Sequence, residues 1–132
     1  MRVRRLDHFG IEVSDLDRAE AFYTGVLGLE VHRRFGHFIE LQGHNCMLAL
    51  FRNPGMHPMG GGDVRDPFGK GHWAFEVTPK ELREGLERFS RDGIPHRGPV
   101  DWGDHDCLYF LDPDGNLLEI VAYRDGASRK EE

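Results

Sequence analysis

Two short stretches decide the fold: DHFGIEV at residues 7–13 and GHWAFEV at residues 71–77. From the histidine onward, both read histidine, aromatic, small, apolar, glutamate, valine, and His8 and His72 stand 64 positions apart. Around the first stretch, side chains alternate between the two sides of an extended chain, which predicts a strand over 4–13. The recurrence indicates that one supersecondary unit is present twice.

The same order of elements follows each stretch. Apolar residues at helical spacing predict a helix over 14–28, capped by Ser14 or Asp15, and a second helix over 79–93 behind a Thr78 cap. Apolar runs between glycine and proline signals predict three strands after each helix, at 29–35, 37–41 and 46–51 and at 94–98, 107–112 and 116–123. Both halves therefore read βαβββ, which predicts an α+β fold with the two modules sharing one curved surface.

The 132 residues suffice for one compact domain with a real core. We expect module one at about 4–51, a loop at 52–70, module two at about 71–123 and a frayed tail at 124–132. The loop is rich in proline and glycine and follows neither the helical nor the strand period. It is either a lid over a site or a floppy insertion, and the sequence leaves both readings open.

Composition excludes several classes of partner. The formal charge of −6, with only a short arginine run at the N-terminus, excludes a general nucleic-acid binder, which needs a clustered basic face. No apolar run has the length of a membrane span. The two cysteines, Cys46 and Cys107, form no CxxC motif and no disulfide framework, which favours a reducing compartment. We expect a cytoplasmic protein that contacts neither nucleic acid nor membrane.

Three segments, 6–31, 71–77 and 108–121, carry a resemblance to the vicinal oxygen chelate superfamily. That superfamily includes glyoxalase I, methylmalonyl-CoA epimerase, fosfomycin-resistance proteins, bleomycin-binding proteins and extradiol dioxygenases. The resemblance covers residues 4–123 and is specific for the superfamily, not for one reaction. It implies paired βαβββ modules that form a cup-shaped or barrel-like mixed sheet, with helices outside, around one divalent metal ion.

Carried onto this sequence, the resemblance implies that His8, His72 and Glu119 are the metal ligands. Two imidazoles and one carboxylate leave positions open for a small substrate that binds through two oxygens. Fe(II) or Mn(II) suits this set best, and Zn(II) or Ni(II) is compatible with it. Glu119 lies in the run NLLEIV, where a cation would offset the cost of burying its carboxylate; otherwise it points to solvent.

A fourth ligand known from glyoxalase I is missing. The resemblance implies a glutamate in the fourth strand of module one, but that segment reads NCMLALF, with Met47 and Ala49 at the inward positions. Neither side chain is a plausible ligand for a hard metal ion. The departure disfavours glyoxalase I and the epimerase, and it favours the fosfomycin and extradiol branches, which use three protein ligands.

Tyr109, ten residues before Glu119, matches a tyrosine that both three-ligand branches use near the metal. Its alternative role is a ring packed over the sheet. The fosfomycin branch would require a lysine and serines in 98–109, where this chain has three aspartates, which would repel a phosphonate. The extradiol branch would require a histidine that relays a proton. The available candidates, each of which could equally be a surface residue, are His44, His57 and His105.

The sequence therefore predicts a metalloenzyme with extradiol-dioxygenase-like chemistry on a small-molecule substrate. The alternatives are a glyoxalase-like lyase or isomerase, a fosfomycin-type transferase, and a metal-free drug-sequestering protein of the bleomycin-resistance type. A homodimer is expected, because sheet edges would otherwise remain open. Four aromatic residues could line the pocket or belong to the core: Phe38, Trp73, Phe75 and Trp102.

Overall fold

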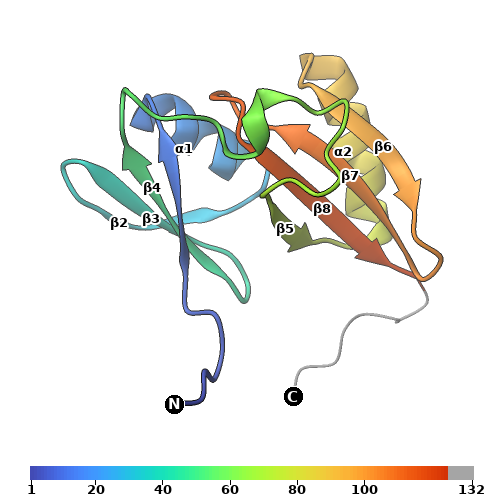
Figure 1. The fold of residues 1–132 in the computed structure, drawn as a ribbon, viewed down its shortest axis with the longest axis horizontal. Coiled ribbons are helices and arrows are strands. Elements are labelled where there is room, and N and C mark those ends of the chain that lie inside the picture. Colours follow the sequence, from blue (N-terminus) through green and yellow to red (C-terminus); the bar gives the residue numbers. More distant parts are fainter. Residues whose placement is uncertain (125–132) are drawn as a thin grey trace. The chain divides into compact units, whose positions relative to one another are not determined.

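A computed structural model describes residues 1–124 (Figure 1). The chain divides after His57 into two compact units, called unit one and unit two. Unit one contains β1 (Phe9–Val13), α1 (Leu16–Gly25), β2 (Glu30–Arg34), β3 (Phe38–Gln42) and β4 (Met47–Arg52). Unit two contains the 3-10 helix η1 (Met59–Gly62), β5 (Trp73–Glu76), α2 (Pro79–Asp92), β6 (His96–Asp101), β7 (His105–Leu111) and β8 (Leu117–Tyr123). The predicted α+β class and the repeated βαβββ order are confirmed.

The two sheets have the same topology. Strand order is β1-β4-β3-β2 in unit one and β5-β8-β7-β6 in unit two, with four strands in each sheet. The first strand of each module runs parallel to the fourth, and the remaining pairs are antiparallel. Neither sheet closes into a barrel, so each keeps two edge strands.

One face of each sheet is packed against the helix of its unit. In unit one, Leu48 and Leu50 of β4 are fully buried, and α1 lies against this strand. In unit two, the ring of Phe110 stacks on Phe89 of α2 with centroids 4.6 Å apart. Side chains at the alternate strand positions point to the opposite face, called the helix-free face below, because successive strand residues point to opposite sides.

The strand predicted over 4–13 is shorter than expected. β1 begins at Phe9, which pairs with Leu48 of β4. The pairing does not extend to Met47, the first residue of β4, which pairs with Gln42 of β3. Residues before Phe9 therefore lie outside the sheet, and His8 precedes it directly.

Helix boundaries follow their caps. Asp15, not Ser14, caps α1, because its carboxylate accepts the Arg18 N–H at 3.0 Å. The helix ends at Gly25, three residues before the predicted Gly28, whose φ of +67° instead turns the chain towards β2. The predicted Thr78 cap of α2 is confirmed, and Glu81 completes a capping box.

Replacing Thr78 by alanine should lower the free energy of unfolding by about 1 kcal/mol, because the Glu81 N–H loses the hydroxyl that it donates to at 3.1 Å. Urea unfolding followed by circular dichroism measures the change. Ser90→Ala, at an exposed position of the same helix, is the control and should change stability by less than about 0.5 kcal/mol. Equal effects of the two substitutions would contradict a capping role.

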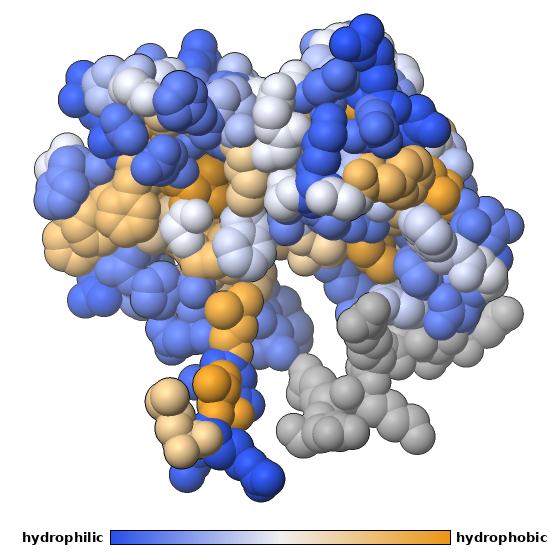
Figure 2. Space-filling model, viewed as in Figure 1, coloured by the Kyte–Doolittle hydropathy of each residue, from blue (hydrophilic) through white to orange (hydrophobic). Residues whose placement is uncertain are grey.

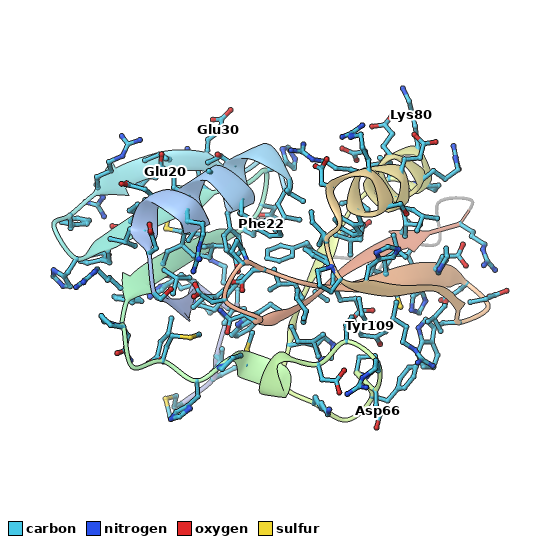
Figure 3. All side chains as sticks on the ribbon, turned by 90° about the horizontal axis from the view of Figure 1, so that it is seen from above. Glu20, Phe22, Glu30, Asp66, Lys80 and Tyr109 are labelled. Atoms are coloured by element: carbon cyan, nitrogen blue, oxygen red, sulfur yellow. The ribbon has the colours of Figure 1, made fainter. Side chains whose placement is uncertain are left out.

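The loop that precedes β5 is packed onto the helix-free face of unit two, as Figure 3 shows around Tyr109. The Met59 N–H donates to the Asn116 side chain at 2.8 Å, and Val64 packs against the apolar cluster of this face. Pro67 is fully buried. The ring of Phe68 meets Tyr109 edge-on, with centroids 5.7 Å apart. These contacts describe an anchored cover and not a floppy insertion.

Two further expectations concern the chain as a whole. Cys46 is exposed and Cys107 is buried, and both are free thiols. Within residues 1–124, neither α1 nor α2 is long and apolar enough to cross a membrane.

Candidate metal centre

Unit two brings two of the three predicted ligands into contact. His72 Nε2 lies 3.0 Å from Glu119 Oε1. His72 stands directly before β5, and Glu119 lies in the middle of β8, in parallel register with Ala74. The register places both side chains on the helix-free face, where Glu119 is only 7% exposed. A buried carboxylate and an imidazole thus share one site.

A second contact defines which nitrogen of His72 faces the carboxylate. The Nδ1 atom lies 2.7 Å from the Lys70 carbonyl oxygen, which can only accept a hydrogen bond. Nδ1 therefore carries a hydrogen and donates it, as metal-binding histidines usually do to a carbonyl or carboxylate. In the neutral tautomer the lone pair of Nε2 then points at Glu119, so two acceptor atoms meet at 3.0 Å. Such a contact needs either a shared proton or a cation, and the imidazole–carboxylate pair fits a divalent metal ion.

Tyr109 lies beside this pair on β7, in register with Glu119. Its ring centroid is 5.7 Å from that of His72, edge-on. Burial first, and then the charge of Glu119, raise the pKa of Tyr109 well above its ordinary value. The phenol therefore stays protonated at neutral pH and can donate a hydrogen bond.

Cys107 is a site residue that the sequence did not reveal. It points to the same face as Tyr109, two residues earlier on β7, and its thiol accepts the Trp102 indole N–H at 3.2 Å. Burial, only partly opposed by the Trp102 hydrogen bond, raises the pKa of Cys107 to about 11. The thiol is therefore neutral at pH 7, and the nearby charge of Glu119 acts on its pKa in the same direction as burial. Strand alternation counted back from Tyr109 is the signal that could have found it.

The third predicted ligand, His8, belongs to unit one. It is exposed, and its Nδ1 lies 2.7 Å from the Asp7 carboxylate. It lines a cavity of about 440 Å³ on the helix-free face of unit one. Within residues 1–124, neither unit by itself gathers three His, Cys, Asp or Glu side chains into a metal-binding group. The role of His8 stays a prediction.

The position of the missing fourth ligand follows from strand register. β5 pairs Ala74 with Glu119, and β1 pairs Gly10 with Ala49 in the same way. Ala49 is therefore the counterpart of Glu119 in unit one. It is buried and lines the cavity beside Met47, and neither side chain carries a ligand atom suited to a hard metal ion.

The three histidines predicted as proton relays lie in different surroundings. His44 is exposed in the β3–β4 turn, and His57 is exposed at the end of unit one. His105 is half-buried, hydrogen-bonded to Asp104 at 2.6 Å, and its ring lies 4.9 Å from that of Tyr123. His105 and Tyr109 are four positions apart along β7, which corresponds to about 13 Å. Within unit two, His105 is therefore not placed for direct contact with the His72–Glu119 pair.

The four aromatic residues considered for the pocket separate into two groups. Trp73 and Phe75, both half-buried, pair in register with Leu118 and Ile120, which lie on the face packed against α2, so these two do not lie on the helix-free face. Trp102 lies on the helix-free face of unit two and meets Phe68 edge-on, at 6.0 Å between centroids. Phe38 lines the cavity of unit one.

The chain is similar in sequence to several known proteins. The model of the Glyoxalase/Bleomycin resistance protein/Dioxygenase superfamily matches residues 5–120. Biphenyl-2,3-diol 1,2-dioxygenase 3 of Rhodococcus globerulus is 33% identical over 88% of this chain, which spans only 62% of that protein's length. Lactoylglutathione lyase of Salmonella typhimurium is 28% identical over 92% of this chain and 94% of its own.

A solved structure shows the same fold. The fosfomycin resistance protein of Listeria monocytogenes, crystallised with Mn(II) and sulfate, is similar with a TM-score of 0.73 at 20% identity, over 94% of each chain.

Proposed function

Because this chain belongs to the glyoxalase/bleomycin resistance protein/dioxygenase superfamily, we propose that it is a divalent-metal enzyme with extradiol-dioxygenase-like chemistry on a small substrate. The observation that carries the proposal is the partly buried contact between His72 Nε2 and Glu119 Oε1 at 3.0 Å. We further propose His8 as the third ligand and Fe(II) or Mn(II) as the metal. A relative that is a diol dioxygenase and a structural neighbour crystallised with Mn(II) support this assignment.

The residues of unit two have separable tasks in this reading. A bound divalent ion would supply Lewis acidity towards two substrate oxygens. The Lys70 carbonyl holds the His72 ring in one tautomer, so that Nε2 is free to ligate. The Tyr109 hydroxyl can donate to a substrate oxygen that gains negative charge. The cover formed by Val64 and Phe68 packs over Tyr109 and its apolar neighbours on the helix-free face, which would limit the access of water to the site.

Three features of the chain bear on the lyase, transferase and drug-sequestering alternatives. The lyase alternative has support from the lactoylglutathione lyase of Salmonella typhimurium, but Ala49 stands where a fourth carboxylate would be expected. For the fosfomycin-type transferase, the repulsion expected from the aspartates in 98–109 is weaker than the sequence implied, since Arg124 pairs with both Asp101 and Asp106. A drug-sequestering protein would have no need of the His72–Glu119 contact. The dioxygenase reading therefore remains the best supported.

Assembly is a separate proposal. β1 and β2 are the edge strands of unit one, and β5 and β6 are those of unit two. Because exposed edges favour pairing with further strands, we propose a homodimer.

The function is tested by adding Fe(II) and oxygen to the metal-stripped protein and following catechol cleavage through the yellow ring-opened product. We expect turnover that depends on Fe(II), and we expect Tyr109→Phe to lower kcat about 100-fold with the metal content unchanged, because a donor to the developing charge is lost. Tyr123→Phe, at the end of β8, is the matched control. If Fe(II) binds at the site but no catechol is cleaved, the dioxygenase reading fails and the lyase becomes the next hypothesis.

A further inference from the structure

In unit one, Ala49 of β4 stands at the position equivalent to Glu119 and has no carboxylate. The neighbouring strand β3 carries one beside it, on Glu40. In unit two, β7 pairs Tyr109 with Glu119. In unit one, β3 pairs Glu40 with Ala49 in the equivalent register. Glu40 is therefore the counterpart of Tyr109, and the acidic side chain of this module lies on β3 where unit two has its phenol.

Glu40 faces a cavity that aromatic side chains border. The cavity, of about 440 Å³, is lined by Glu40, Ala49, His8 and two aromatic rings. Those rings, Phe38 and Phe51, stack with centroids 5.2 Å apart and planes 23° from parallel. Ala49 is too short to fill the space in front of Glu40. Figure 2, which views the helix-free face, shows apolar side chains gathered over unit one.

Arg33 sets the charge of this cavity. Its guanidinium lies 3.0 Å from one Glu40 oxygen and 3.4 Å from the other, and an irregularity in β2 between Val31 and Arg33 brings the two side chains opposite each other. The Glu40 side chain is 16% exposed and that of Arg33 is 62% exposed. The pair is neutral as a whole, so a cationic ligand gains little, and Glu40 with Asp7 opposes an anion. A neutral hydrogen-bond donor meets no such penalty, and the Glu40 carboxylate is a strong acceptor for it.

We propose that the cavity of unit one binds the aromatic ring of a phenolic ligand and that Glu40 accepts a hydrogen bond from its ring hydroxyl. The ring packs against Phe38 and Phe51, and Arg33 holds the carboxylate in place from the solvent side. The inference rests on the proposed function in naming catechols as the ligand class. It adds Glu40 as the residue that selects ligands with a free hydroxyl.

The test is calorimetric titration of the metal-stripped protein with catechol and with 1,2-dimethoxybenzene, which has the same ring but no hydroxyl. Glu40→Gln should weaken catechol binding about 10-fold, because a neutral amide replaces a charged acceptor. The same variant should leave the affinity for 1,2-dimethoxybenzene unchanged. Glu30→Gln is the matched control, since Glu30 is exposed at the start of β2 and projects outward (Figure 3). Phe51→Leu should weaken both ligands alike, because it removes a wall of the cavity.

Two results would overturn the inference: no catechol binding by the unmodified protein at millimolar concentration, or equal catechol binding by Glu40→Gln and Glu30→Gln. Thermal melting of each variant separates loss of binding from loss of folding, and the response of Phe51→Leu still tests the cavity if Glu40→Gln unfolds. Since no metal is present in the titration, its outcome is independent of the proposed reaction. Glu40-dependent binding without metal uptake would leave this inference standing and defeat the proposed function.

Discussion

Replacing His72 by alanine should lower the affinity of the protein for Mn(II) by at least about 100-fold. Even changes to residues that only support a ligand cost 10-fold to 100-fold in metal affinity, and His72 is proposed to bind the metal directly. Its Nε2 faces Glu119 at 3.0 Å, and its Nδ1 is held by the Lys70 carbonyl, so the ring is oriented with Nε2 towards the proposed metal site. Electron paramagnetic resonance of free Mn(II) during a titration measures the affinity.

His32→Ala is the matched control for this experiment. His32 is an exposed histidine of β2, so its loss should leave Mn(II) binding unchanged. His8→Ala tests the proposed third ligand in the same titration and should also weaken binding. Unchanged affinity in His72→Ala would defeat the proposal of a metal centre at this contact. Unchanged affinity in His8→Ala alone would remove only that residue from the site.

Replacing Asp112 by alanine should lower the free energy of unfolding by about 3 kcal/mol. Asp112 is buried, and its carboxylate accepts the N–H groups of Asp114 and Asn116 and the side-chain amide of Asn116, each at 2.9 Å. Hydrogen bonds to a charged group contribute about 1.5–3 kcal/mol, and their loss would leave buried donors without an acceptor. Urea unfolding measures the change.

The same network explains why the effect should reach the cover of unit two. Asn116, which Asp112 holds, accepts the Met59 N–H at 2.8 Å and so ties the cover to the β7–β8 turn. We therefore expect limited proteolysis between residues 58 and 70 to become faster in Asp112→Ala. The control is Asp66→Ala, because Asp66 is exposed on the loop and points away from the sheet (Figure 3). A loss of stability no larger than that of Asp66→Ala would contradict this role.

The fold could be predicted from the sequence because its signals are local and occur twice. The recurrence of DHFGIEV as GHWAFEV, two helical periods and the Thr78 cap suffice for the βαβββ order. The length of β1 could not be predicted, since residues 4–8 alternate like a strand, whereas pairing with β4 begins only at Phe9, opposite Leu48. Pairing across the sheet is information that no local pattern contains.

The site was harder to predict, for a similar reason. His72 and Glu119 could be named from the repeat and the resemblance, but the Lys70 carbonyl and Cys107 became visible only with the contacts of the folded chain. The sequence did not decide on which face of the sheet Trp73 and Phe75 lie. The pairing of β5 with β8 places them on the face that packs against α2. The Gly115 N–H donates to the Asp112 carbonyl oxygen at 2.9 Å and closes the turn between β7 and β8. The use of this turn as an anchor for the cover depends on a hydrogen bond across 57 residues of sequence.

The two free thiols allow the local opening of unit two to be measured by chemical labelling. Cys46 is exposed in unit one, whereas Cys107 is fully buried in unit two, with a pKa raised to about 11 by burial. A thiol reagent should therefore modify Cys46 at once. It should reach Cys107 only in molecules in which the sheet of unit two has transiently opened. The slower of the two labelling phases would then report the opening free energy of unit two alone, in the native protein and without denaturant.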